Sequence, residues 1–231
     1  MLMKKTIILF VISYILSNPA VEVLSYNAQF KNIGAGSAIL KTTTFDNLQE
    51  KEIFFSFKTK NFVDFFYKIR ENILMRVDEK QYFINYIKID SQNGKRLKKH
   101  EATFDYDRNK VYFQNDSLII SQQVYNPISI ISFLRNQNLS IGKQFSFNIY
   151  NVGNIKPVGM EVVGEEKVKI KNKSYNCYVL APFYLQASDE NNKKGEIKLW
   201  ISKKLHLPVI IEQNANFGEI ILKLNNVVYE N

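Results

Sequence analysis

The sequence predicts a mainly β protein: an antiparallel, strongly curved sheet or open β-barrel of about a dozen strands with two short helices. Two observations support this prediction. Apolar and polar residues alternate with a period of two through most of the chain, and turn signals separate the alternating runs at short, regular intervals. Such spacing favours antiparallel hairpins over the β-α-β units of parallel sheets. The rest of the chain adds two helical segments and a leader.

The expected strands follow one another as short alternating runs. Asn93-Gly94 marks a tight hairpin turn, because both residue types tolerate positive φ. In the next hairpin, Phe104 and Tyr106 are expected to face the returning strand at residues 111–113. The runs are residues 26–30, 37–45, 52–57, 69–77, 82–90, 97–106, 111–113, 145–150, 158–163, 168–170 and 175–180, with three more strands in 195–224.

Residues 61–69 break the period of two. Phe62, Phe65 and Phe66 recur at helical spacing, and Asn61 is a fair residue for the start of a helix. We therefore expect a short amphipathic helix here.

Residues 126–135 carry a stronger helix signal. A cap residue, Asn126, precedes a proline, and Ile131 and Leu134 then repeat on one face. Two interpretations stay open for both helices. Either they fill the barrel as ordinary core, or they line or cover an apolar cavity.

The N-terminus has the three parts of a secretory signal peptide in residues 1–20. A short basic start precedes an apolar run of eleven residues, 6–16, and a small, turn-prone segment follows it. The run is too short to span a bilayer as a retained helix. We expect cleavage near Ala20, or as late as Ser25. Residues 21–231 would then form a single periplasmic domain with no stable membrane span.

The single cysteine, Cys177, excludes an intramolecular disulfide. We also expect that the protein is not a lipoprotein, because a lipid anchor needs a cysteine at the cleavage point. Its neighbours alternate and include no basic residue or histidine, which predicts an inert core thiol. His100 and His206 are the only histidines and have no metal-ligand spacing. We expect no metal, no cofactor, no catalytic residue and no enzymatic activity.

The formal charge is +9, from 31 basic and 22 acidic residues. Most lysines alternate with apolar residues, as on the solvent side of strands, and only residues 95–99 and 167–173 are clusters. Each cluster lies beside a hairpin turn. Because an exported protein rarely meets nucleic acid, we expect no nucleic-acid partner. The charge instead fits solubility or weak attraction to an anionic membrane surface.

Several different short motifs follow one another along the chain. They are Tyr26 with Gly34-Ala35-Gly36, residues 127–135 before Gly142, Tyr175-Asn176-Cys177 before Pro182, residues 199–202 before Leu207-Pro208, and residues 217–224. With these motifs the chain resembles an uncharacterised family of exported bacterial proteins, family 3108 of the domains of unknown function. The resemblance covers nearly all of the mature chain. It implies a periplasmic setting and supplies no biochemical activity.

The closing segment is also similar to the end of the Lol-type lipoprotein carriers, in which a strand with a tryptophan precedes a Leu-Pro strand and a glycine-led strand. Those carriers are open, bent sheets whose helices close an apolar cavity for acyl chains. The similarity concerns the fold alone. The arginine that latches the carriers has no matching position here. Arg70 and Arg135 are candidates only by their place beside helices, and we expect both on the surface.

Two functions of different classes remain open. The favoured one is a periplasmic, non-enzymatic binding protein that holds a lipid or other apolar ligand in cell-envelope biogenesis, since a barrel of this size can enclose an apolar cavity. The alternative is a structural or interaction protein with a filled core that docks on envelope proteins. The expected ligand-binding residues are Phe62, Phe65, Phe66, Ile131, Leu134 and Trp200.

Overall fold

The computed structural model describes the chain from Ala20 almost to its C-terminus. The predicted signal peptide, residues 1–20, lies outside the described residues except for Ala20. The description covers residues 20–31, 33–46, 48–183, 197–215 and 218–230, and the side chains of Asn61, Phe62 and Ala215 lie outside it.

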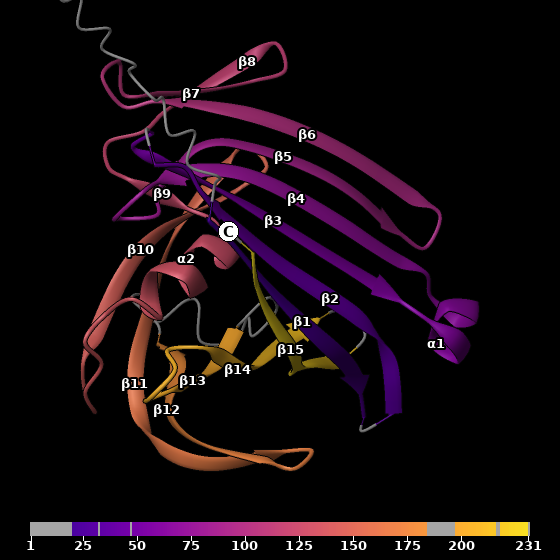
Figure 1. The fold of residues 1–231 in the computed structure, drawn as a ribbon. Coiled ribbons are helices and arrows are strands. Elements are labelled where there is room, and N and C mark those ends of the chain that lie inside the picture. Colours follow the sequence, from indigo (N-terminus) through magenta and orange to yellow (C-terminus); the bar gives the residue numbers. More distant parts are fainter. Residues whose placement is uncertain (1–19, 32, 47, 184–196, 216–217, 231) are drawn as a thin grey trace, which may run out of the picture.

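A single sheet of fifteen strands makes up most of the described chain and coils into an unclosed barrel (Figure 1). Strands that follow one another in the chain pair with each other, except β8 and β9, and β15 pairs with β1; β8 and β9 are therefore the two free edges. All pairings are antiparallel except that of β9 with β10. The predicted fold class is confirmed, with more strands than expected. The strands are β1 (Ala20–Phe30), β2 (Ile33–Thr44), β3 (Glu50–Thr59), β4 (Ile69–Asp78), β5 (Ile84–Asn93), β6 (Arg96–Asp105), β7 (Lys110–Phe113), β8 (Asp116–Ile119), β9 (Val124–Tyr125), β10 (Gln144–Asn151), β11 (Asn154–Ile170), β12 (Lys173–Phe183), β13 (Ile197–Ser202), β14 (Pro208–Ala215) and β15 (Gly218–Glu230).

Two differences in strand number have a structural reason. β8 and β9 contain four and two residues, too few for an alternating pattern to stand out. Conversely, the runs 158–163 and 168–170 belong to one strand, β11, which has a bulge between Val162 and Gly164. A bulge bends its strand and reverses the alternation beyond it. The hairpin of β11 and β12 accordingly curls away at the lower end of the barrel (Figure 1).

The first predicted hairpin is present, and the second is present in part: Phe104 has an expected partner, whereas Phe113 lies opposite Ala102 and not Tyr106. Gly94 has a φ of 62° in the turn between β5 and β6, the conformation that glycine adopts at no steric cost. In the next hairpin, Phe104 lies opposite Val111. Tyr106 lies just beyond β6, and its hydroxyl donates to the carbonyl oxygen of Ile84 at 2.7 Å.

Helix α2 (Pro127–Leu134) confirms the stronger helix prediction and lies in the hollow of the coiled sheet (Figure 1). The side chain of Asn126 accepts a hydrogen bond from the backbone N–H of Ile128 at 2.9 Å. The hydroxyl of Ser129 accepts the N–H of Asn126 in return, at 3.1 Å. This capping box satisfies donors that would otherwise be buried without partners.

We expect Asn126→Ala to lower the free energy of unfolding by about 1–2 kcal/mol, because the cap is buried and its loss leaves the Ile128 N–H without an acceptor. Chemical denaturation followed by circular dichroism measures the change. Asn126→Ser, which keeps an acceptor oxygen, is the control and should recover most of the loss. Equal losses in the two variants would show that the cap bond contributes little.

The core has two parts on opposite faces of the sheet. The main cluster fills the hollow around α2 and includes Leu199 and Ile201 of β13. Trp200, between them, points to the other face. There it belongs to a smaller cluster with Val168, Cys177, Val179 and Val209. Period-two alternation along β13 is the cause of this separation.

Helix α1 (Asn61–Phe66) is shorter than the predicted 61–69, because Ile69 already begins β4. It connects β3 to β4 at the far end of the sheet, away from the hollow that contains α2 (Figure 1). Phe65 is 86% exposed and Phe66 is 66% exposed. The expectation that these two phenylalanines line the interior is therefore wrong.

Candidate functional site

A cleft forms where the sheet splits. β13 and β14 are shorter than the strands that flank them: β12 pairs with β13 only from Cys177 to Leu180, and β15 pairs with β14 only as far as Lys223. Residues 173–176 of β12 and 224–230 of β15 therefore extend past their neighbours. The turn from β13 to β14 lies between these two extensions but does not reach as far as they do. The extensions therefore have no strand between them, and this leaves a gap in the sheet.

The turn is fixed to β12 on one side of the gap. The backbone N–H of Lys203 donates to the carbonyl oxygen of Asn176 at 2.9 Å. Within the turn, the N–H of His206 donates to the carbonyl oxygen of Ser202, also at 2.9 Å, and His206 is exposed with a φ of 53°. The gap between the turn and the two strand extensions has a volume of about 890 Å³.

The floor of the cleft is apolar and continues into the core. Leu207 is 4% exposed and belongs to the main cluster, against which Val227 also packs. Two further residues of the cleft lie nearer the surface: Leu205, which is 50% exposed, and Tyr229, which is 67% exposed. An apolar path thus leads from the solvent to the core.

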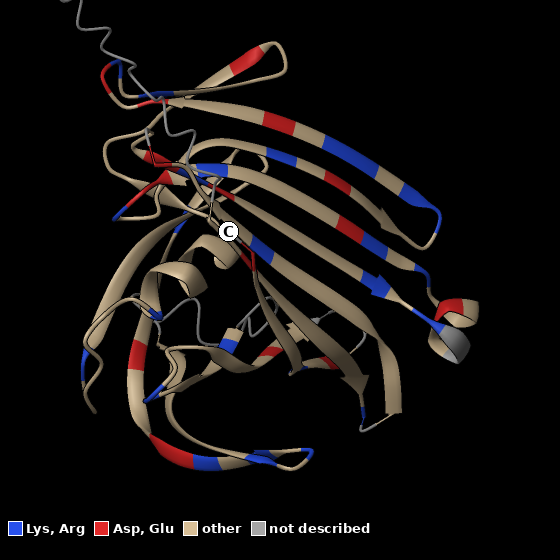
Figure 2. Cartoon of the chain, in the orientation of Figure 1, with Lys and Arg blue, Asp and Glu red and all other residues tan. Residues whose placement is uncertain are grey.

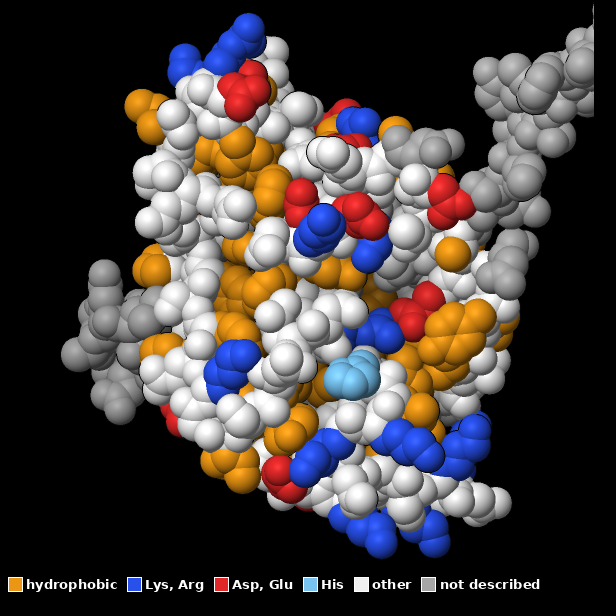
Figure 3. Space-filling model, turned by 60° about the vertical axis from the view of Figure 1, so that its left-hand side comes forward, with side chains coloured by type: hydrophobic (Ala, Val, Ile, Leu, Met, Phe, Trp, Pro, Cys, Tyr) orange, Lys and Arg blue, Asp and Glu red, His pale blue; other side chains and the backbone are white. Residues whose placement is uncertain are grey.

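The rim of the cleft is basic. Lys203 is paired with Glu165, with 2.7 Å between Nζ and Oε1, and this hydrogen bond raises the pKa of Lys203. Lys167, Lys173 and Lys204 also line the cleft and take part in none of the ion pairs found in the described part of the chain. Figure 3 shows basic side chains gathered along the lower edge of the molecule. This is the end at which the β11–β12 hairpin lies in Figure 1.

The tip of the β11–β12 hairpin reaches across to β15. The Nζ of Lys171 donates to the Oδ1 of Asn225 at 2.5 Å, and the side chain of Asn27 on β1 donates to the same oxygen at 3.3 Å. The bond from Lys171 joins the two sides of the split sheet, and the bond from Asn27 links β15 to its neighbour β1.

One wall of the cleft adjoins the smaller apolar cluster. The indole N–H of Trp200 donates to Oε2 of Glu166, a cleft residue, at 2.7 Å. Burial, and next the Glu166 carboxylate, raise the pKa of Cys177 to about 11. The thiol therefore stays protonated at neutral pH, as expected for the predicted inert core cysteine.

The six predicted ligand-binding residues do not come together. Ile131 and Leu134 belong to α2 and are fully buried in the main cluster, whereas Trp200 packs on the opposite face of the sheet. Phe65 and Phe66 are exposed at the far end. The side chain of Phe62 lies outside the described residues. Among the described residues that line the cleft, none belongs to the predicted set.

Arg135 differs from the expectation of a surface arginine, whereas Arg70, whose side chain is 32% exposed, lies at the surface in an ion pair. Arg135, which ends α2, binds Glu22 of β1 through two hydrogen bonds of 2.5 and 2.9 Å, and its side chain is only 12% exposed. Its Nε also donates to the carbonyl oxygen of His206 at 2.8 Å. Arg70 makes a bidentate pair with Asp64 of α1. Sequence alone offers no signal for the Arg135 pair, because Glu22 and His206 lie far from Arg135 in the chain.

The Arg135 pair also bears on the predicted cleavage site. Residues from Val21 onwards pair with both β2 and β15. Cleavage at Ser25 would remove Glu22, the partner of a largely buried arginine, whereas cleavage after Ala20 retains it. Both the cleavage and its position stay predictions.

Within the described ranges, no group of three or more histidine, cysteine, aspartate or glutamate side chains is arranged to hold a metal ion. Among the same residues, no helix has the length and apolar character needed to cross a membrane.

Comparison with known proteins agrees with the fold. The model of a protein family described as "Protein of unknown function (DUF3108)" matches residues 25–225. No curated protein matches the chain. Among solved structures, the crystal structure of a β-barrel-like protein of the domain of unknown function DUF1849 from Brucella abortus superimposes with a TM-score of 0.60 at 10% identity. The match covers 92% of this chain and 98% of that one. At this identity the similarity concerns the fold alone.

Proposed function

Because the chain belongs to the DUF3108 family, which is described only as proteins of unknown function, we propose a function from the geometry of the cleft. The protein is a non-enzymatic binding protein that holds an amphiphilic anion, such as a lipid with an acidic headgroup. Its setting, on the strength of the predicted signal peptide, is the periplasm, and its role lies in cell-envelope biogenesis.

One observation supports this proposal above the others: the same cleft joins an apolar floor to a basic rim. Its volume of about 890 Å³ lies within the range of sites that hold small molecules. Leu205, Leu207 and Val227 offer apolar surface to a hydrocarbon chain, whose burial yields roughly 25 cal/mol per Å². Lys173 and Lys204 offer positive charge to a headgroup at the rim.

The side chains around the cleft favour binding over catalysis. Glu165 is engaged by Lys203 and Glu166 by Trp200. Cys177 has a raised pKa and so is a weak nucleophile at neutral pH. The two carboxylates of the cleft are therefore already engaged, and its thiol is protonated at neutral pH.

The alternative function, an interaction protein with a filled core, is supported by a different observation. α2 occupies the hollow of the barrel, and both Ile131 and Leu134 are 0% exposed. This observation argues against a ligand in the hollow and leaves the cleft as the place for one. The two functions differ in one expected result, the binding of amphiphiles by the purified protein.

Titration of the mature protein with a long-chain fluorescent fatty acid tests the proposal. We expect saturable binding that weakens by at least about tenfold in the variant Lys173→Glu/Lys204→Glu, since two attractive charges become repulsive. The control Lys88→Glu/Lys110→Glu changes the net charge equally at exposed positions of β5 and β7, away from the cleft. Its affinity should stay within about twofold of the unchanged protein. Equal loss in both variants, or no binding at all, would refute the proposal.

A further inference from the structure

The end of the sheet that carries α1 exposes large apolar side chains on two neighbouring connections. Phe65 and Phe66 stand on α1, 86% and 66% exposed, and Leu97, 72% exposed, follows the turn between β5 and β6. The two connections touch, because the N–H of Gly94 in that turn donates to the carbonyl oxygen of Lys68 at 2.8 Å. We call this end, formed by residues 58–71 and 92–99, the aromatic tip. It lies apart from the β11–β12 hairpin and the β13–β14 turn, which border the cleft (Figure 1).

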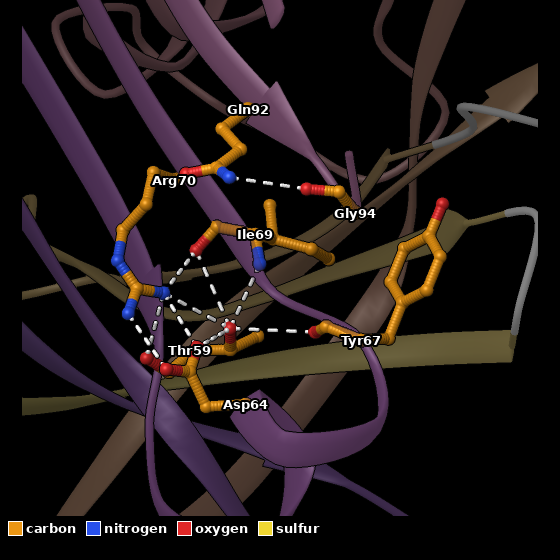
Figure 4. A network of polar contacts seen from close by, with 7 residues as sticks. All are labelled: Thr59, Asp64, Tyr67, Ile69, Arg70, Gln92 and Gly94. Carbon is orange, nitrogen blue, oxygen red and sulfur yellow. Dashed lines mark hydrogen bonds and ion pairs between the residues drawn. The ribbon is translucent and has the colours of Figure 1, made fainter. Parts of the chain in front are cut away.

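A polar network holds α1 in place on the sheet (Figure 4). The guanidinium of Arg70 donates two hydrogen bonds to the carboxylate of Asp64, of 2.7 and 2.8 Å, and the hydroxyl of Thr59 donates a third at 2.6 Å. Thr59 in turn accepts the N–H of Ile69 at 2.9 Å. The hydrogen bonds from Arg70 and Thr59 lower the pKa of Asp64 to about 2. At neutral pH the network is therefore complete, and it fixes the direction in which the exposed phenylalanines project.

The aromatic tip is also strongly basic, and Figure 2 shows basic residues at the ends of neighbouring strands there. Of its two acidic residues, Asp64 is bound by Arg70, and burial raises the pKa of Glu71. Seven exposed basic residues surround the apolar side chains: Lys58, Lys60, Lys68, Lys95, Arg96, Lys98 and Lys99.

We propose that the aromatic tip docks the protein on the surface of an anionic lipid bilayer, with Phe65 and Phe66 inserted among the headgroups and the surrounding lysines against the phosphates. Aromatic side chains are favoured at the membrane interface, and long basic side chains reach the headgroup plane while their apolar stems stay below it. Basic residues near an anionic leaflet add an attraction that depends on ionic strength.

The shape and charge of the tip favour a membrane over a protein partner. Phe65 and Phe66 are exposed on α1 at the end of the sheet, and the basic residues of the tip stand on several strands rather than on one edge. A laterally mobile anionic surface can satisfy such a spread of charges without a matching pattern of carboxylates. The docking does not depend on the proposed cleft ligand, since no residue of the tip lines the cleft.

Co-sedimentation with lipid vesicles tests this proposal. We expect the mature protein to sediment with vesicles of phosphatidylglycerol and phosphatidylethanolamine, to do so less at high salt, and to bind phosphatidylcholine vesicles weakly. Phe65→Ser/Phe66→Ser should lower the partition coefficient by at least about tenfold. The matched control is Ile119→Ser/Ile141→Ser, which removes two apolar side chains that are 77% and 62% exposed outside the tip. The control should bind as the unchanged protein does.

Tryptophan fluorescence places the contact at the tip. In Phe65→Trp, the new indole should shift its emission to shorter wavelength when anionic vesicles are added, whereas Ile119→Trp should not shift. Trp200 is 6% exposed and supplies a constant background emission.

Equal sedimentation of the tip and control variants, or a shift at both positions, would overturn the proposal. So would tip-dependent cross-linking to an envelope protein without vesicle binding, which would identify a protein partner. The cleft variant Lys173→Glu/Lys204→Glu should still give the Phe65→Trp shift.

Discussion

Replacing Arg135 by methionine is expected to lower the free energy of unfolding by about 3–5 kcal/mol, the usual cost of removing one partner from a largely buried ion pair. Arg135 and Glu22 are 12% and 18% exposed at their side chains, and the pair is bidentate. Without Arg135, the Glu22 carboxylate loses the two hydrogen bonds of the pair, and the carbonyl oxygen of His206 loses a donor. The variant would also release the end of α2 from β1 and from the β13–β14 turn.

Urea denaturation of Arg135→Met, Glu22→Gln and the double variant measures this effect. Because the two residues are in direct contact, we expect the double variant to be more stable than the sum of the single losses predicts. Arg108→Met is the control: Arg108 is 75% exposed, and its Nη1 lies 3.6 Å from Asp105. Such a pair contributes about 0–1 kcal/mol. A loss for Arg135→Met no larger than that of the control would contradict the structural role assigned to Arg135.

Leu134→Ala should destabilise the protein by about 2–5 kcal/mol, because it leaves a cavity under α2 where the side chain is fully buried. Leu134 belongs to the main cluster, at the end of α2 that Arg135 fixes to β1. If α2 instead covered an empty pocket, the truncation would cost much less, since the side chain would have few contacts to lose.

Phe65→Ala serves as the comparison. The sequence predicts the same role for both residues, but Phe65 is 86% exposed. Its removal should change the free energy of unfolding by no more than about 0.5 kcal/mol in the absence of lipid. Thermal and denaturant unfolding of both variants gives the two values. Similar losses at the two positions would show that the interior and exterior assignments are wrong.

The sequence predicts the fold class well because alternation is a local property. Each strand carries its own period, and Asn126-Pro127 marks the start of α2 without reference to the rest of the chain. The number of strands is harder to predict, because β8 and β9 are held by their neighbours and are too short to show a period.

The positions of the aromatic residues depend on contacts that the pattern does not contain. Trp200 lies between Leu199 and Ile201, so all three positions are apolar and alternation does not reveal which face points into the barrel. An amphipathic helix such as α1 likewise has an apolar face whether or not a layer lies beneath it. Only the pairing of the whole sheet shows that α1 lies at its far end.

The cleft could not be located from the sequence, because it results from a difference in length between paired strands. On the side of the cleft, β13 and β14 stop at the turn formed by residues 203–207, whereas β12 and β15 extend further. One signal was available: the basic cluster 167–173 lies beside a predicted hairpin turn, and Lys167 and Lys173 line the cleft. The sequence shows the charge, whereas the apolar floor next to it comes from distant segments.

Native mass spectrometry of the mature protein, purified from the envelope of the cell that produces it, tests the central claim most directly. We expect a fraction of the protein to carry the mass of an amphiphilic anion, and we expect this fraction to fall in Lys173→Glu/Lys204→Glu but not in Lys88→Glu/Lys110→Glu. Protein that carries no added mass in any preparation, or a lipid adduct unaffected by the cleft substitutions, would contradict the proposal that the cleft binds such a ligand.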